Sequence, residues 1–287
     1  MKWGIPLSAP IVAGTDGSDG SARALDWAAA EATLRERPLK IVHTVGGRPY
    51  EKAPVARDEA AASMARAGRM LLGAAVEHVQ ERWPGLATTT TLASGEPWRA
   101  LSAQSEEAFE LVLGSRGQGG FAGLALGSTS LRMAERSTIP VVIVREGAFD
   151  DGDILVGVDP VRDVGAILDY AFDAAESHHA RLRVVHAWQT LATFIAAGYA
   201  DAEQIEAELR KEVMAACRPL RRRHREVDVV VDIVLEHPVA ALSKASRTAR
   251  LLVVGAHDWR WSSPQLGSVS HGVLHHAQCP VAIVPAC

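Results

Sequence analysis

The chain has few cysteines, and their positions argue against a disulfide or zinc scaffold. Three cysteines occur in 287 residues, at Cys217, Cys279 and Cys287. Their number is odd, all lie in the last third of the chain, and no pair has the C-x-x-C spacing. We therefore expect neither a disulfide framework nor a cysteine-based metal site.

The sequence also lacks a strong net charge and long apolar runs. A formal net charge of −4 gives no broad positive field for a polyanion, so a nucleic-acid partner is not expected. No apolar run reaches the roughly 18 residues that span a bilayer, and residues 1–6 lack the apolar core of a signal peptide. We expect no membrane partner and a cytoplasmic location.

What the chain does contain indicates two folded domains. Hydrophobic residues make up 48% of the sequence and charged residues 22%, which is typical of globular proteins. A chain of 287 residues is long enough for two domains of about 140 residues, each with its own core.

An internal repeat supports this division. Residues 11–16 (IVAGTD) recur as 154–159 (ILVGVD), and residues 40–43 (KIVH) recur as 183–186 (RVVH) in the same register. Residues 111–114 (LVLG) likewise recur as 252–255 (LVVG). We place one domain at 1–147 and a second at 153–287, joined by the small, acidic stretch between them.

Each half alternates short Val- and Ile-rich runs with helical stretches. Continuous apolar runs are typical of strands that are covered on both faces, as in parallel sheets. The first half predicts strands near 10–15, 39–45, 87–92, 110–114 and 140–144, and helices at 21–37, 58–82, 97–108 and 128–137, the first of which opens with a capping serine. The predicted fold is two tandem doubly wound α/β domains, Rossmann-like, each a five-stranded parallel sheet with helices on both faces.

A glycine-rich segment from Gly114 to Ser128 follows the fourth predicted strand and precedes a helix. Glycine lets the backbone approach a ligand closely, and consecutive amides can then hold phosphate oxygens. Gly127, Ser128 and Thr129 begin the helix, where unpaired N–H groups favour an anion, and Arg116 can add charge-assisted bonds. The alternative is a surface loop with a serine cap.

The spacing Gly114-x2-Gly117-x9-Gly127-Ser128 resembles the signature of ATP-binding universal stress proteins. The strand ending in Asp16, the strand ending in His43 and the run 139–144 resemble that family as well, over nearly all of the chain. The resemblance implies a tandem pair of such domains, a strand order of 3-2-1-4-5 in each, and ATP as the ligand, with Mg²⁺ as a candidate counter-ion.

The resemblance also implies roles for individual residues. Gly14, Thr15 and Asp16 would lie beside the adenine, and Thr44, just after the second strand, near the base and ribose. Gly114 and Gly117 would flank the ribose and phosphates, and Gly127, Ser128 and Thr129 would hold the phosphate chain. The turn at residues 16–21 has a second interpretation, in which Asp16 only caps the following helix.

The resemblance further implies pairing between fifth strands, which in a tandem chain would make an intramolecular pseudo-dimer. A homodimer and a protein partner of unknown identity stay open.

The second copy departs from this pattern. Gly255, Gly267 and Ser268 are kept, but Asp258 replaces the second glycine, and Trp259 and Trp261 replace small residues. A carboxylate repels phosphate, so we expect a degenerate phosphate loop and at most a weak second site at Asp159, Gly255, Gly267 and Ser268. The tryptophans are interpreted as packing over that site or forming a partner surface.

Two further clusters are interpreted without a ligand. His271, His275, His276 and Cys279 lack a carboxylate that would complete a metal motif, so we assign no metal site. The basic run 218–225 follows a predicted helix at 203–217 and suits a solvated helix C-terminus. His43 and His186 end matching strands and are interpreted as structural.

The sequence contains no Walker lysine after its Gly-Ser pair and no Gly-x-Ser-x-Gly elbow. Only Arg116 and Asp16 could assist phosphate chemistry, so we assign no catalytic residue. The leading hypothesis is an ATP-binding regulatory module of a stress response, acting by conformational change or association. The alternatives are a weak ATP hydrolase or nucleotide-transferring enzyme, and a nucleotide-free scaffold.

Overall fold

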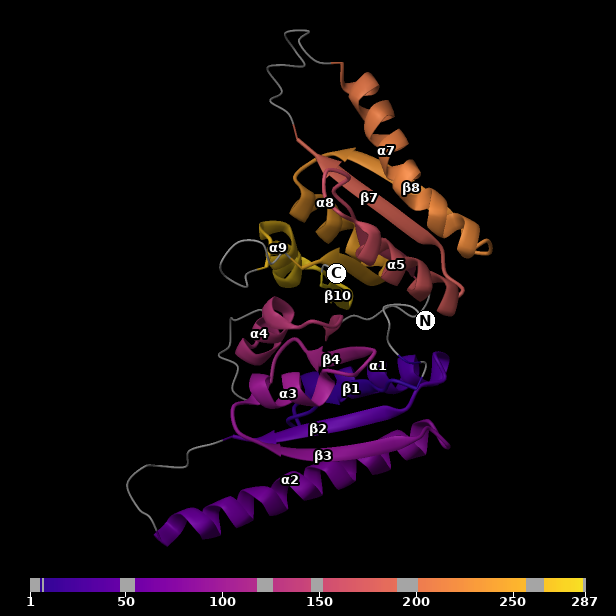
Figure 1. The fold of residues 1–287 in the computed structure, drawn as a ribbon. Coiled ribbons are helices and arrows are strands. Elements are labelled where there is room, and N and C mark those ends of the chain that lie inside the picture. Colours follow the sequence, from indigo (N-terminus) through magenta and orange to yellow (C-terminus); the bar gives the residue numbers. More distant parts are fainter. Residues whose placement is uncertain are drawn as a thin grey trace. The chain divides into compact units, whose positions relative to one another are not determined.

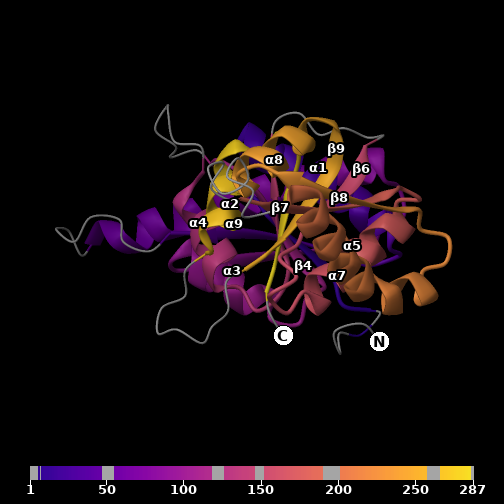
Figure 2. The same cartoon turned by 90° about the horizontal axis from the view of Figure 1, so that it is seen from above.

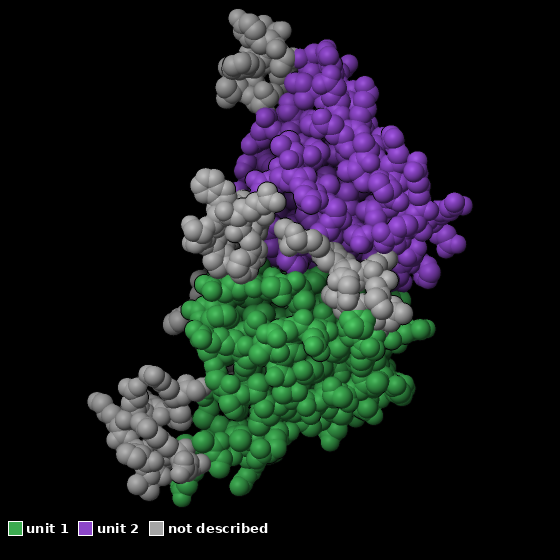
Figure 3. Space-filling model, in the orientation of Figure 1, with its two compact units in different colours: residues 1–145 green, residues 146–287 purple. Residues whose placement is uncertain are grey.

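The protein is described from a computed structural model that covers residues 6, 8–46, 55–117, 126–145, 152–189, 201–256 and 266–285. The chain divides into two compact units, residues 1–145 and 146–287 (Figure 3). Each unit is described by itself below.

Five parallel strands form the sheet of the first unit. They are β1 (Ile11–Gly14), β2 (Leu39–Val45), β3 (Thr88–Ser94), β4 (Glu110–Gly114) and β5 (Val141–Val144), in the spatial order β3-β2-β1-β4-β5 (Figure 1). Every pair is parallel, with Ile11 opposite Leu39 on one side and Glu110 on the other. The predicted fold class and strand order are confirmed for this unit.

The burial of these strands explains their apolar composition. All residues of β1, β4 and β5 are buried, because these strands have helices on both faces. The edge strand β3 has no buried residue, and threonine occupies its first four positions. The core of this unit therefore lies in the middle of the sheet, around β1, β4 and β5.

Four helices connect the strands of the first unit: α1 (Asp19–Leu34), α2 (Val55–Arg82), α3 (Pro97–Ser105) and α4 (Ser128–Arg136). The prediction that α1 opens with a capping Ser21 is wrong by one turn. Ser18 is the N-cap, since its side chain accepts from the Ser21 amide, and the helix begins at Asp19. The long helix α2 packs along β2 and β3 (Figure 1).

The second unit repeats this design. Its strands are β6 (Asp153–Gly157), β7 (Leu182–Trp188), β8 (Val229–Leu235), β9 (Ala249–Gly255) and β10 (Val281–Val284), all parallel, in the order β10-β9-β6-β7-β8. Its helices are α5 (Gly165–Ser177), α7 (Ala202–Arg223), α8 (Pro238–Ala245), η1 (Ser246–Thr248) and α9 (Ser268–His276), with α5 packed against α7 (Figure 2).

Helix α7 is longer than the sequence predicted. It continues from the expected end at Cys217 to Arg223, with Pro219 inside it. Proline removes one backbone hydrogen bond, but Val213, Cys217 and Leu220 are buried on one face, and this packing holds the last turns in place. The basic run therefore forms the end of the helix instead of following it.

Among the described residues, no helix is both long enough and apolar enough to cross a membrane.

Candidate functional site

The candidate site of the first unit lies at the carboxyl ends of β1 and β4. Because the strands are parallel, the turn after β1, the segment after β4 and the start of α4 meet at one edge of the sheet (Figure 1). This is where ligands bind in doubly wound folds.

Hydroxyl groups organise the turn after β1. Thr15 Oγ1 and Ser21 Oγ lie 3.2 Å apart, and Ser21 Oγ donates to the Ser18 carbonyl at 2.9 Å. Asp16 Oδ1 accepts from the Ser18 amide at 3.0 Å and from Ser18 Oγ at 2.6 Å. Gly17 has a φ of 82°, which a side chain would strain. Asp16 therefore bonds within the turn, but the residue that caps α1 is Ser18 and not Asp16.

His43 ties this turn to the second strand. His43 Nδ1 lies 2.8 Å from the Thr15 carbonyl oxygen, so this nitrogen carries the proton and donates it. His186 Nδ1 makes the same contact with the Val158 carbonyl at 2.9 Å in the second unit. Both histidines hold the backbone at the end of the first strand of their unit.

The glycines of the site allow close backbone contacts. A Cβ on Gly114 would lie 2.6 Å from the Gly20 carbonyl carbon and oxygen, so the end of β4 approaches the first turn of α1 directly. A Cβ on Gly117 would overlap Asp16 Oδ2, which places the second carboxylate oxygen against the main chain at Gly117. A Cβ on Gly14 would lie 3.2 Å from Leu101 Cδ2 of α3.

Among the described residues, no side chain caps the N-terminus of α4. Gly127 is the N-cap residue, and its own amide donates to the Ser115 carbonyl at 2.7 Å. Ser130 points its hydroxyl inward, to the Gly114 carbonyl at 2.8 Å. The backbone N–H groups of the first turn and the side chains of Ser128 and Thr129 lie at the N-terminal end of the helix. The positive end of the helix dipole favours an anion there.

The remaining predicted residues lie around this centre. Arg116 follows β4 and is exposed, while its carbonyl oxygen packs on Gly20. Thr44 lies inside β2, opposite Ala93, and not after the strand as predicted, because β2 continues to Val45. The middle of the glycine-rich segment, residues 118–125, lies outside the described residues.

In the second unit, the turn after the first strand is built differently. Asp159 Oδ1 accepts from the Val161 amide at 3.3 Å, and Oδ2 pairs with Arg162 Nε at 3.3 Å. Helix α5 begins only at Gly165, and its N-cap, Val164, provides no side-chain bond. When the two copies are aligned by the repeat, α1 starts three residues earlier than α5.

This difference has a clear origin in the sequence. Thr15, Ser18 and Ser21 of the first copy correspond to Val158, Val161 and Val164 of the second. Valine can neither cap a helix nor hold a turn through a hydroxyl. The sequence interpretation treated only the phosphate loop of the second copy as altered and missed these three substitutions, although a position-by-position comparison of the copies would have found them.

The other predicted residues of the weak second site keep part of the arrangement. Ser270 Oγ donates to the Gly255 carbonyl at 2.6 Å, as Ser130 does to Gly114, and Gly267 and Ser268 begin α9 without a side-chain cap. Asp258, Trp259 and Trp261 lie outside the described residues, so the predicted degenerate loop stays a prediction.

A metal centre was not expected, and the described residues contain no group of three or more candidate metal ligands. The rings of His271 and His275 lie near each other, with centroids 4.8 Å apart and planes tilted by 45°.

Fold and site together define a class of protein: a tandem pair of doubly wound α/β units with a candidate anion-binding edge in the first unit. The model of the universal stress protein family matches residues 9–145 and again 152–285. The chain therefore belongs to the universal stress protein family, and the expected resemblance is confirmed.

Relatives of similar length support this assignment. The universal stress proteins Rv2005c and Rv1996 of Mycobacterium tuberculosis (strain ATCC 25618 / H37Rv) are each 30% identical to the chain, over 95% of it and over 96% and 94% of their own lengths. The crystal structure of a universal stress protein from Archaeoglobus fulgidus DSM 4304 covers 96% of this chain, and 98% of that protein is matched, with a TM-score of 0.71 at 20% identity. At this identity the structural likeness shows the fold.

Proposed function

We propose that the first domain, predicted at residues 1–147, binds ATP and acts as a nucleotide-dependent regulatory module of a cytoplasmic stress response. The observation that carries the proposal is the N-terminus of α4, which has no side-chain cap from the described residues and lies at the same edge of the sheet as Asp16 and Gly117. The backbone N–H groups of its first turn and two hydroxyls suit a phosphate chain, with Mg²⁺ as a candidate counter-ion.

The proposed ligand set is the one that the family resemblance implies. Gly14, Thr15, Asp16 and Thr44 would contact the nucleoside, and Gly114, Arg116, Gly117, Gly127, Ser128 and Thr129 the ribose and phosphates. Asp16 Oδ2 lies against the main chain at Gly117, so the carboxylate stands at the same edge of the sheet as the proposed phosphate site.

We further propose that each chain has one strong site. In the second unit, Arg162 pairs with the carboxylate of Asp159, and the hydroxyls of the first turn are replaced by valine. A nucleotide there would have to displace an ion pair and would meet a turn without hydroxyl groups. Pairing between the fifth strands and self-association of the chain stay predictions.

Calorimetric titration with ATP tests this proposal. The wild type is expected to bind one ATP per chain. Gly117→Asp should lose that binding, because a carboxylate would face the phosphates. Asp258→Gly should gain no second site of equal affinity. Two equal sites in the wild type would contradict our interpretation of the second unit. No binding would favour the scaffold alternative, and turnover of several ATP per second that Asp16→Ala abolishes would favour an enzyme.

A further inference from the structure

One tryptophan and three arginines gather where α3 meets α4 in the first unit. Trp98 and Arg99 belong to α3, and Arg132 and Arg136 belong to α4. The guanidinium carbons of Arg99, Arg132 and Arg136 lie 5.1, 6.0 and 5.3 Å from the centroid of the Trp98 ring. All three arginines are exposed, and the tryptophan is half-buried. We call these four residues the Trp98 surface.

The positive charge of this surface is only partly balanced. Glu96 accepts from Arg132 at 2.6 Å and pairs with Arg99 at 3.2 Å. The Trp98 side chain, followed by these two arginines, lowers the pKa of Glu96. Arg136 has no carboxylate partner within ion-pair distance among the described residues. Two guanidinium groups thus share the Glu96 carboxylate, and the third has no carboxylate partner in the part of the chain that the structure describes.

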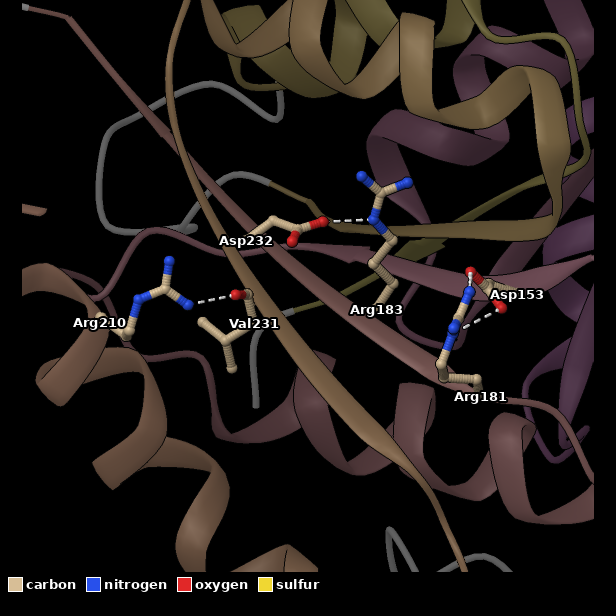
Figure 4. Close-up of polar contacts among 6 residues, drawn as sticks. All are labelled: Asp153, Arg181, Arg183, Arg210, Val231 and Asp232. Atoms are coloured by element: carbon tan, nitrogen blue, oxygen red, sulfur yellow. Dashed lines mark hydrogen bonds and ion pairs between the residues drawn. The ribbon is translucent and has the colours of Figure 1, made fainter.

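Three arginines of the second unit have partners that offset or fix their charged groups. Arg181 pairs with Asp153 through two nitrogen–oxygen contacts, at 3.1 and 2.8 Å, and Arg183 pairs with Asp232 (Figure 4). Arg210 spans from α7 to the Val231 carbonyl of β8 at 2.5 Å and also pairs with Glu206. These arginines have partners within their own unit, whereas the Trp98 surface carries an excess of positive charge.

The fold does not need the Trp98 surface in order to pack these two helices. In the second unit, Val239 stands in place of Trp98 and Gly272 in place of Arg132. A Cβ on Gly272 would lie 2.7 Å from Val239 Cγ2, so α8 and α9 close on each other through an apolar contact. The same helix pair is therefore held together without arginine or tryptophan.

We propose that the Trp98 surface binds an acidic peptide segment of a partner protein. Guanidinium groups bind carboxylates through paired hydrogen bonds, and the partly exposed indole gives apolar area for the side chains between them. The arginines come from two helices, so several carboxylates along one peptide match the surface better than a single small anion does. The surface uses other residues than the proposed nucleotide site, although both include part of α4, with Arg132 one turn after Ser128.

Fluorescence anisotropy with a labelled peptide of alternating Glu and Ala, titrated with the full chain at low salt, tests the proposal. The double variant Arg99→Gln/Arg136→Gln is chosen because it leaves the Glu96–Arg132 pair between the helices in place. It is expected to weaken binding about fivefold or more, since two exposed ionic contacts are lost. Arg99→Lys/Arg136→Lys should restore much of the affinity, and added salt should weaken wild-type binding.

The matched control is Arg218→Gln/Arg222→Gln, which removes two exposed charges from α7 and makes the same change in net charge. It should bind the peptide like the wild type. Gly117→Asp should also bind it normally, which separates this site from the nucleotide site.

Three results would overturn the proposal: no saturable binding by the wild type, an equal loss in the α7 control, or a loss in Gly117→Asp. Displacement of the peptide by inorganic phosphate at equal total charge would also overturn it, because the surface would then select small anions.

Discussion

The two carboxylate oxygens of Asp16 have different surroundings, and this separates its two suggested roles. Oδ1 is engaged by the amide and hydroxyl of Ser18, within the turn that starts α1. Oδ2 faces the main chain at Gly117, on the side of the proposed phosphate site. From the sequence, turn and ligand roles were alternatives. The structure shows the turn contacts of Oδ1, and the ligand role of Asp16 stays a prediction.

Substitutions at Asp16 and Ser18 should therefore differ in their effect on ATP binding. Ser18→Ala removes the N-cap of α1 and should lower the free energy of unfolding by about 1 kcal/mol, with ATP affinity changed less than about threefold. Asp16→Ala should lower stability by a similar amount and weaken ATP binding about tenfold or more, since a hydrogen bond to a charged group is worth roughly 1.5–3 kcal/mol. Urea unfolding and calorimetry measure the two effects. An equal loss of affinity in both variants would mean that Asp16 serves the turn alone.

At the scale of elements, helix α2 contains a matched pair of glycines. A Cβ on Gly68 would lie 2.7 Å from Leu92 Cδ1, 2.9 Å from His43 Cδ2 and 3.3 Å from Val45 Cγ1. His43 cannot easily move away, because its ring is bonded to the Thr15 carbonyl. Gly73, five residues later in the same helix, has nothing within 4 Å of the same position.

Alanine should consequently have opposite effects at the two positions. Gly68→Ala should destabilise the first unit by about 1–3 kcal/mol through overpacking between α2 and the sheet. Gly73→Ala should stabilise it by about 0.5–1 kcal/mol, because alanine is the better helix former and meets no neighbour. The urea midpoints of the two variants and the wild type give the comparison. A gain in stability at both positions would mean that α2 does not lie tightly against β2.

Element boundaries show where sequence patterns were sufficient and where they were not. Buried strands such as β4 were located correctly, because a short apolar run between polar segments is typical of a strand covered on both faces. The start of α1 was placed too late, since Ser18 and Ser21 are both good caps and only the fold decides between them. The end of α7 was missed because a proline usually ends a helix, and burial on one face outweighed that tendency.

For the whole molecule, the repeat made the fold predictable and the difference between the copies hard to see. Two segments in one register were enough to infer two domains of one family, which the family match confirms. In the second copy, the first turn is altered by single replacements, such as Val161 at the position of Ser18. They are spread over a segment that keeps its aspartate. Their effect appears only as a later helix start and an Asp159–Arg162 pair, and neither follows from composition or spacing.

This asymmetry leads to a prediction for hydrogen exchange in the full chain. A ligand that binds only the folded state stabilises it by about 2.7 kcal/mol at a concentration of 100 Kd. Some amide hydrogens of the first unit are expected to exchange only when that unit unfolds, including those of β1 and β4. Their exchange rates should therefore fall by about a hundredfold when ATP is bound. Strands β6 and β9 should show little change, because Asp159 is paired with Arg162 and the hydroxyls of that turn are absent. Gly117→Asp should remove the protection of the first unit by ATP. Equal protection of both units in the wild type would instead show that the second unit also binds a nucleotide.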